Sequence, residues 1–193
     1  MQAGLTADRL IKEQINTVYS SDLNRACETA EAIAGAHGLS IVTDARFREC
    51  QFGEWEGKTV DEVKAGYPLL FEEYCKDSIK NRAPGGERLE ELQLRVIEAL
   101  NEIAGRHPND TIALVTHGGP VKALICHVLG ADLSAFRHLR PDNCGISILI
   151  HSSDDKWYLD TLNDTCHLDR INGNRTGEWF SKVIDDSRKE DVE

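Results

Sequence analysis

Two stretches of this sequence each combine an apolar strand pattern, a polar turn and the start of a helix. They read Val18-Tyr19-Ser20-Ser21-Asp22-Leu23-Asn24-Arg25 and Leu114-Val115-Thr116-His117-Gly118-Gly119-Pro120. In open parallel sheets, ligands bind beyond the carboxyl ends of the strands, where helix N-termini offer unpaired N–H groups to an anion. His117 is the stronger candidate, because a purely structural residue at the end of a buried strand would usually be apolar. Glycines 118 and 119 let the backbone approach a ligand closely.

Taken alone, each turn is weak evidence, because strand–glycine–helix turns are common and Arg25, one turn into its helix, is by default solvated. A third stretch, residues 47–57, holds three glutamates, Glu49 among them, with aromatics and glycines and no regular period. A carboxyl that gives up a proton near neutral pH needs apolar neighbours that raise its pKa, and Phe52 and Trp55 could supply them. Without further context, an exposed acidic loop with two anchoring aromatics is the simpler interpretation.

The elements that must position these residues alternate between short apolar runs and amphipathic helical patterns, which is typical of βα units and a parallel sheet. Helices are expected at 2–13, from a cap at Ser20 or Ser21 to Gly38, at 59–65, 69–76 and 88–106, and from Gly118 to Gly130. Strands are expected at 15–19, 40–43, 111–116, 144–151 and 157–162. We predict an α/β fold in three layers, with a mostly parallel sheet and helices on both faces. A single domain should span residues 1–184, followed by a polar tail at 185–193.

The length, charge and cysteine spacing of the chain disfavour several classes of function. The chain has 193 residues, which suits one domain, and a net charge of −11, which disfavours nucleic acid or an acidic membrane as partner. The six cysteines include no Cys-x-x-Cys pair, so we expect reduced thiols and no metal site. With no basic-then-apolar leader and no apolar run of about 20 residues, we expect a cytoplasmic protein.

Read together, the candidate stretches resemble the histidine phosphatase superfamily, which includes cofactor-dependent phosphoglycerate mutases and many small phosphatases. The matching motifs follow the family's order and cover nearly the whole chain up to about residue 170. They are Tyr19-Ser20-Ser21-Asp22-Leu23-x-Arg25-Ala26-x-Glu28-Thr29-Ala30, Arg48-Glu49-x-x-Phe52-Gly53-Glu54-Trp55-Glu56-Gly57, Pro84-Gly85-Gly86-Glu87, Thr116-His117-Gly118-Gly119, Asp142-Asn143-Cys144 and Asn163-Asp164-Thr165-x-His167-Leu168. The resemblance implies a phosphoglycerate-mutase-like fold.

The resemblance also implies a role for each candidate residue. Arg25 would be a phosphate-binding arginine, whose planar fork holds two phosphate oxygens. His117 would donate a hydrogen bond to the phosphoryl oxygens and stabilise their charge in the transition state. Glu49 would protonate the departing oxygen and then act as base on water, and Gly118 would offer its backbone N–H to the phosphate. The family uses no metal and no nucleotide, so no cofactor is expected.

One part of the family pattern is absent. The resemblance places the nucleophilic histidine in an Arg-His-Gly motif at the end of the first strand, and none of the seven histidines here has that setting. His37 comes nearest, in Ala36-His37-Gly38, but it ends a helix. We expect the missing strand to lie mid-sheet, beside the strand that ends at His117, and the chain alone to be inactive or nearly so. Either the natural protein is longer or this is a truncated relative, and we favour the first because Arg25 and Glu49 are kept.

The resulting hypothesis is a metal-independent phosphomonoester phosphatase that works through phosphohistidine in its complete form. Its substrate would be a small phosphorylated metabolite such as a sugar phosphate, a phosphoglycerate or α-ribazole phosphate. A phosphoglycerate mutase is less favoured because the mutases carry a longer insertion than residues 57–84 provide. A non-catalytic phosphate-binding or interaction protein is the alternative of a different class. The oligomeric state stays open, with a homodimer as one arrangement.

Overall fold

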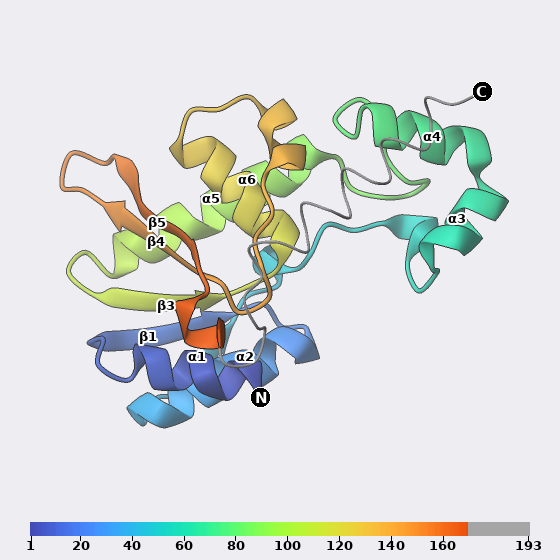
Figure 1. Ribbon diagram of the computed structural model, residues 1–193. Helices are drawn as coiled ribbons and strands as arrows, with labels where there is room; N and C mark the ends of the chain where they lie inside the picture. Colours follow the sequence, from blue (N-terminus) through green and yellow to red (C-terminus); the bar gives the residue numbers. More distant parts are fainter. Residues whose placement is uncertain (170–193) are drawn as a thin grey trace.

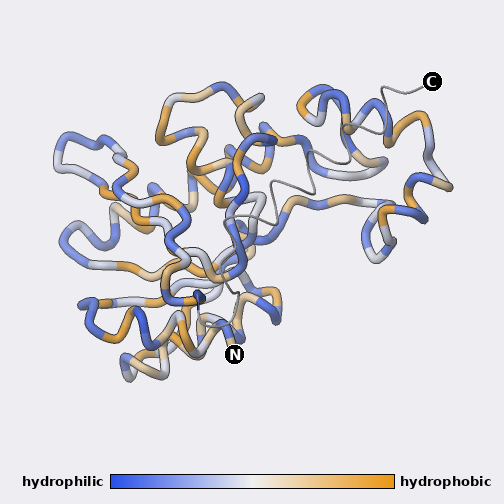
Figure 2. Tube along the Cα trace, in the orientation of Figure 1, coloured by the Kyte–Doolittle hydropathy of each residue, from blue (hydrophilic) through white to orange (hydrophobic). Residues whose placement is uncertain are grey.

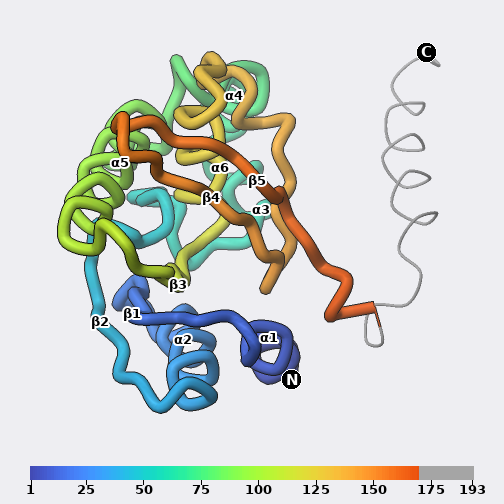
Figure 3. Tube along the Cα trace, turned by 90° about the vertical axis from the view of Figure 1, so that its left-hand side faces the viewer, coloured from blue at the N-terminus to red at the C-terminus, as the bar shows by residue number. Residues whose placement is uncertain are grey.

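The computed structural model describes residues 1–169, which form an α/β domain (Figure 1). Its helices are α1 (Gln2–Leu10), α2 (Asn24–His37), α3 (Val60–Gly66), α4 (Pro68–Lys76), α5 (Leu89–Arg106) and α6 (Gly118–Val128). Its strands are β1 (Ile15–Ser20), β2 (Ile41–Thr43), β3 (Thr111–Val115), β4 (Ile146–His151) and β5 (Trp157–Asp164). Figures 1 and 3 show α1 and α2 on one face of the β1–β3 layer and α5 and α6 on the other. The predicted layers are therefore confirmed.

The main sheet has the order β2-β1-β3, and all its strands are parallel. Ser20, the last residue of β1, is aligned with Thr43 of β2 and with Val115 of β3, so the three carboxyl ends lie at one edge of the sheet. The other two strands form the antiparallel pair β4–β5. Within the described part of the chain, β3 pairs only with β1 and β4 only with β5, so each has one edge without a partner strand.

Two apolar clusters cover the faces of the main sheet. On the α5 side, Leu92 and Val96 are fully buried, because the apolar residues of α5 recur at helical spacing and so share one face. On the α1–α2 side, Val18 of β1 packs with Ala30 and Ile33. Figure 2 shows hydrophobic and hydrophilic residues alternating along these helices, as expected for elements with one buried face.

Most predicted elements agree with the structure to within a few residues, but the capping prediction was wrong. The N-cap of α2 is Leu23 and makes no side-chain cap. Ser20 and Ser21 are fully buried at the end of β1, where the hydroxyl of Ser20 donates to the Ser21 carbonyl. At the other end of α2, Gly38 adopts a φ of +66°, a left-handed conformation that suits glycine, and ends the helix as predicted. The predicted tail at 185–193 lies outside the described residues.

The segment between Gly57 and Pro84 holds the two short helices α3 and α4, which extend from one side of the domain (Figure 1). They pack around Trp55, whose ring contacts those of Tyr67, Phe71 and Tyr74. Within residues 1–169, no helix has the length and apolar character needed to cross a membrane.

Candidate active site

The turns that follow β1 and β3 bring Ser21, Arg25 and His117 into contact. The parallel pairing aligns the two strand ends, and the Ser21 amide donates to the Val115 carbonyl at 2.9 Å. His117, only 8% exposed, is the N-cap residue of α6. Its Nε2 lies 2.8 Å from the Ser21 hydroxyl, and Nε of Arg25 donates to its Nδ1 at 3.2 Å.

These contacts fix the protonation of His117. A guanidinium can only donate a hydrogen bond, so the Nδ1 that accepts from Arg25 carries no proton. A neutral ring then has its proton on Nε2, which donates to the Ser21 hydroxyl. Burial of the ring and the nearby positive charge of Arg25 both lower the pKa of His117 below its ordinary value. His117 is therefore a neutral hydrogen-bond donor near pH 7.

Glu49 reaches the same edge of the sheet from the loop before α3. Its carboxylate accepts hydrogen bonds from the Cys50 amide at 2.8 Å and from the Gly119 amide at 3.0 Å. A Cβ atom at position 119 would clash with this carboxylate, so the second glycine of the His117-Gly118-Gly119 turn is required for the approach. Gly118 lies beside it, in the first turn of α6, where backbone N–H groups have no intrahelical acceptor.

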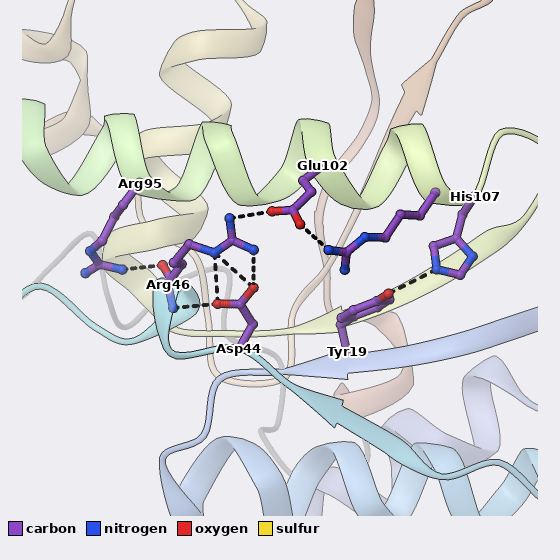
Figure 4. Close-up of polar contacts among 7 residues, drawn as sticks. Tyr19, Asp44, Arg46, Arg95, Glu102 and His107 are labelled. Atoms are coloured by element: carbon purple, nitrogen blue, oxygen red, sulfur yellow. Dashed lines mark hydrogen bonds and ion pairs between the residues drawn. The ribbon is translucent and has the colours of Figure 1, made fainter.

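The backbone that carries Glu49 is anchored by α5 and by the end of β3. Arg95 of α5 donates to the carbonyl groups of Arg46 and Glu49 and forms an ion pair with Glu87. Thr116 donates to the Phe47 carbonyl at 2.7 Å. Figure 4 shows the Arg95 contact beside the ion pairs that join Arg46 to Asp44 and Glu102. The loop that carries Glu49 is thus held in place by side chains of α5 and of the residue that follows β3.

The Pro84-Gly85-Gly86 segment also packs against the loop that carries Glu49. The Glu54 amide donates to the Pro84 carbonyl at 2.9 Å, and the Glu87 amide donates to the Gln51 carbonyl at 2.8 Å. Side chains at Gly53 and Gly86 would collide with the facing backbone. These glycines therefore allow the two segments to pack closely enough to hold Glu49 in place.

A cavity of about 780 Å³ opens beside Glu49 and the start of α6. Glu49, Gly118 and Gly119 line it, whereas Arg25 and His117 are not among its lining residues. The wall also holds three aromatic rings, two cations and a carboxylate: Phe52, Tyr74, Phe136, Lys122, Arg140 and Asp142. Its volume suits a small metabolite.

The structure thus brings the predicted residues Arg25, Glu49, His117 and Gly118 to one edge of the sheet. One expectation around Glu49 was wrong: Trp55 packs against α3 and α4, while Phe52 lines the cavity beside the carboxylate. Within residues 1–169, no three His, Cys, Asp or Glu side chains gather in a metal-binding arrangement.

Sequence reasoning did not single out Ser21 or Lys122 as site residues. The signal for Lys122 was available, because it is the only charged residue in the apolar run from Val121 to Cys126. Ser21 could have been found from the expected parallel pairing, because it follows β1 as Thr116 follows β3, next to His117.

Comparisons of sequence and of structure with known proteins point to the same superfamily. A family model described as "Histidine phosphatase superfamily (branch 1)" matches residues 1–165. Phosphoserine phosphatase 1 of Hydrogenobacter thermophilus is 38% identical over 167 residues, covering 86% of this chain and 79% of the relative. The probable phosphoglycerate mutase GpmB of Serratia proteamaculans is 33% identical, covering 87% and 80%. The solved structure of Bacillus stearothermophilus YhfR superimposes with a TM-score of 0.82 at 28% identity, over 86% of this chain and 83% of that one.

Proposed function

This chain belongs to the histidine phosphatase superfamily, and from that premise we propose that its complete form is a phosphomonoester phosphatase working through a phosphohistidine intermediate. The single observation that carries the proposal is the contact of Arg25 with His117, next to a glutamate bound at the start of α6. A cation, a neutral hydrogen-bond donor and the positive end of a helix dipole together suit a phosphoryl group.

Each side chain would have a distinct role. Arg25 and the Gly118 amide hold the phosphoryl oxygens, and the Nε2–H of His117 shifts from Ser21 to one of them as negative charge grows. Glu49 gives its proton to the ester oxygen as the bond to phosphorus breaks. It then takes a proton from the water that attacks the phosphohistidine, which releases inorganic phosphate and restores the histidine.

The nucleophile of this scheme is not found among the seven histidines, none of which stands between an arginine and a glycine. We propose that turnover needs an Arg-His-Gly strand alongside β3, and that residues 1–193 alone are inactive or nearly so. Within residues 1–169 one edge of β3 has no partner strand, which supports this position, because β3 ends at Val115, two residues before His117, and pairs on its other side with β1. A strand there would end near the Arg25–His117 contact.

Two alternatives are weighed against the phosphatase. A cofactor-dependent mutase is less favoured, because the segment between Gly57 and Pro84 contains only the short helices α3 and α4 as potential cover. A non-catalytic phosphate-binding protein is favoured by one observation, the absence of an Arg-His-Gly motif from the sequence. Both alternatives keep the phosphate site and differ from the phosphatase in turnover.

Phosphate binding tests the site itself. Isothermal titration of the chain with inorganic phosphate should show saturable binding, and Arg25→Ala should weaken it by roughly tenfold to a hundredfold, since it removes a charge-assisted hydrogen bond. Arg9→Ala is a matched control and should leave the affinity unchanged, because Arg9, on α1, pairs with Glu13 just beyond the helix. Equal loss in both variants, or no binding at all, would remove the basis of the proposal.

Turnover then separates an enzyme from a binding protein. The chain extended at Met1 by a strand ending in Arg-His-Gly should hydrolyse an aryl phosphate and form a trappable phosphohistidine. The same extension ending in Arg-Ala-Gly should do neither, and His117→Ala should abolish hydrolysis by the active form. Phosphate binding without hydrolysis in the Arg-His-Gly form would favour the non-catalytic protein instead.

A further inference from the structure

Two charged residues of the matching motifs have no role in the phosphatase scheme. Asp22 directly follows Ser21 in the turn after β1, and Arg48 directly precedes Glu49 in the loop before α3. Their side chains form a bidentate ion pair: Nε of Arg48 donates to Oδ1 of Asp22 at 2.6 Å, and Nη2 donates to Oδ2 at 2.5 Å. Two parallel hydrogen bonds fix the relative orientation of the two groups as well as their distance.

The ion pair joins the two sides of the candidate site. The turn after β1 is held to His117 through the Ser21 hydroxyl. The loop before α3 places the Glu49 carboxylate at the Gly119 amide. The ion pair connects these two segments, which lie 26 positions apart in the sequence, through the neighbours of Ser21 and of Glu49. It therefore links the turn that holds the phosphoryl-binding residues to the loop that carries the proposed proton donor.

The partial exposure of this ion pair favours a local role over a role in global stability. The side chains of Arg48 and Asp22 are 46% and 30% exposed, and exposed ion pairs contribute little to the stability of a fold. Both groups are charged near neutral pH, because the hydrogen bonds from Arg48 hold the pKa of Asp22 below its ordinary value. The pair should therefore act on the arrangement of the two segments that it joins.

We propose that Asp22 and Arg48 are positioning residues, whose ion pair holds the loop before α3 against the turn after β1 and so keeps the Glu49 carboxylate at the start of α6. Neither residue touches the reacting atoms in this proposal. The inference rests on the proposed function, because Glu49 acts as the proton donor only there. It adds to that scheme two residues that act through Glu49.

The amide of Gly119 reports the position of Glu49 directly. Gly119 lies in the first turn of α6, where backbone N–H groups have no intrahelical acceptor, and its amide donates to the Glu49 carboxylate. Loss of the Glu49 contact therefore removes the hydrogen bond that slows the exchange of this amide with water. Hydrogen exchange of the chain of residues 1–193, followed by NMR without any ligand, measures this effect.

Asp22→Asn and Arg48→Gln should each speed the exchange of the Gly119 amide about three- to fivefold, the upper range for loss of an exposed ion pair. The double variant should show no larger effect, because both substitutions remove the same contact. The two substitutions change the local charge in opposite directions, so faster exchange in both cannot come from altered attraction of the hydroxide that catalyses exchange. Glu13→Gln, which breaks an exposed ion pair with Arg9, should leave the exchange unchanged.

Two further measurements separate the ways in which this inference and the proposed function can fail. The slowest amides of β1 should exchange at the wild-type rate in every variant, since they report global unfolding. Unchanged Gly119 exchange in either single variant, additive acceleration in the double variant, or equal acceleration at Gly119 and in β1 would each overturn the positioning role. Isothermal titration with inorganic phosphate tests the proposed function separately. No binding by the wild-type chain, with Gly119 exchange that depends on the ion pair, would overturn the proposed function while the link to Glu49 holds.

Discussion

The parallel sheet and the β4–β5 pair both contain apolar strands, yet the domain uses them differently. In β1, Val18 is 0% exposed and Tyr19 is 6% exposed, whereas in β4 Ile148 and Ile150 are 41% and 49% exposed. Arg25 and His117 lie in or after the turns that follow the parallel strands β1 and β3. Among the described residues that line the cavity none lies on β4 or β5, but Asp142 before β4 and Thr165 after β5 flank this antiparallel pair.

The two groups of strands therefore contribute differently to the candidate site. The phosphoryl end needs side chains fixed to within a fraction of an ångström, and the buried end of β1, at Val18, Tyr19 and Ser20, supplies that rigidity. Residues 140–142 and Thr165, which also line the cavity, lie in segments outside the helices and strands. Loops on a rigid scaffold are where binding specificity usually varies.

The largest expected effect tests whether β1 is buried more deeply than β4. Val18→Ala should lower the free energy of unfolding by about 2 kcal/mol, because it removes buried methyl groups and leaves a small cavity beside Ala30 and Ile33. Ile150→Ala should cost less than about 1 kcal/mol, because its side chain is half exposed already. Urea unfolding measures both, and equal losses would show that β4 is buried as deeply as β1 in solution.

A second prediction concerns the phosphoryl end and compares two glycines. Gly119→Ala should slow aryl phosphate hydrolysis by the Arg-His-Gly form by about tenfold, or about 1.4 kcal/mol, because the new methyl group displaces Glu49, the proposed proton donor, from the amide it accepts from. Gly105→Ala is the matched control in α5, where an added methyl group meets nothing within 4 Å. It should stabilise the protein by up to about 1 kcal/mol and leave hydrolysis unchanged. Unchanged hydrolysis in Gly119→Ala would mean that the position of Glu49 does not matter to proton transfer.

The same comparison explains how far the sequence alone could predict this structure. β3 and α5 were predicted to within about a residue at either end, because their apolar residues follow the periods of a strand and of a helix. The cap of α2 was predicted wrongly, because a local signal, a serine before a helix, was overridden by a distant partner. Ser21 bonds to His117, which is 96 residues away along the chain.

The candidate site also depends on contacts between residues that are distant in the sequence. Motifs placed Arg25, Glu49 and His117 at turns and loops, and the parallel pairing of β1 with β3 explains why two of them meet. The packing of Trp55 could not be predicted, since it depends on the rings supplied by α3 and α4. Lys122 was not singled out, because the cavity that it lines is completed by Phe136, which follows α6 in the sequence and contacts Lys122 only in the folded chain.

The smallest expected effect is a pH dependence that belongs to the phosphoryl end alone. Burial and Arg25 lower the pKa of His117, so the unfolded chain binds more protons than the folded protein between that lowered value and the ordinary histidine value of 6.5. Stability should therefore rise with pH across this window, and the contribution should be complete above pH 6.5 and lost as the pH falls through it. His117→Gln should flatten the rise in the free energy of unfolding measured with urea from pH 5 to 7.5, whereas Ile150→Ala, a substitution on β4 that removes no titratable group, should keep the wild-type slope. A slope that persists in His117→Gln would assign the dependence to another group and would mean that the Arg25–His117 contact does not hold the ring neutral in solution.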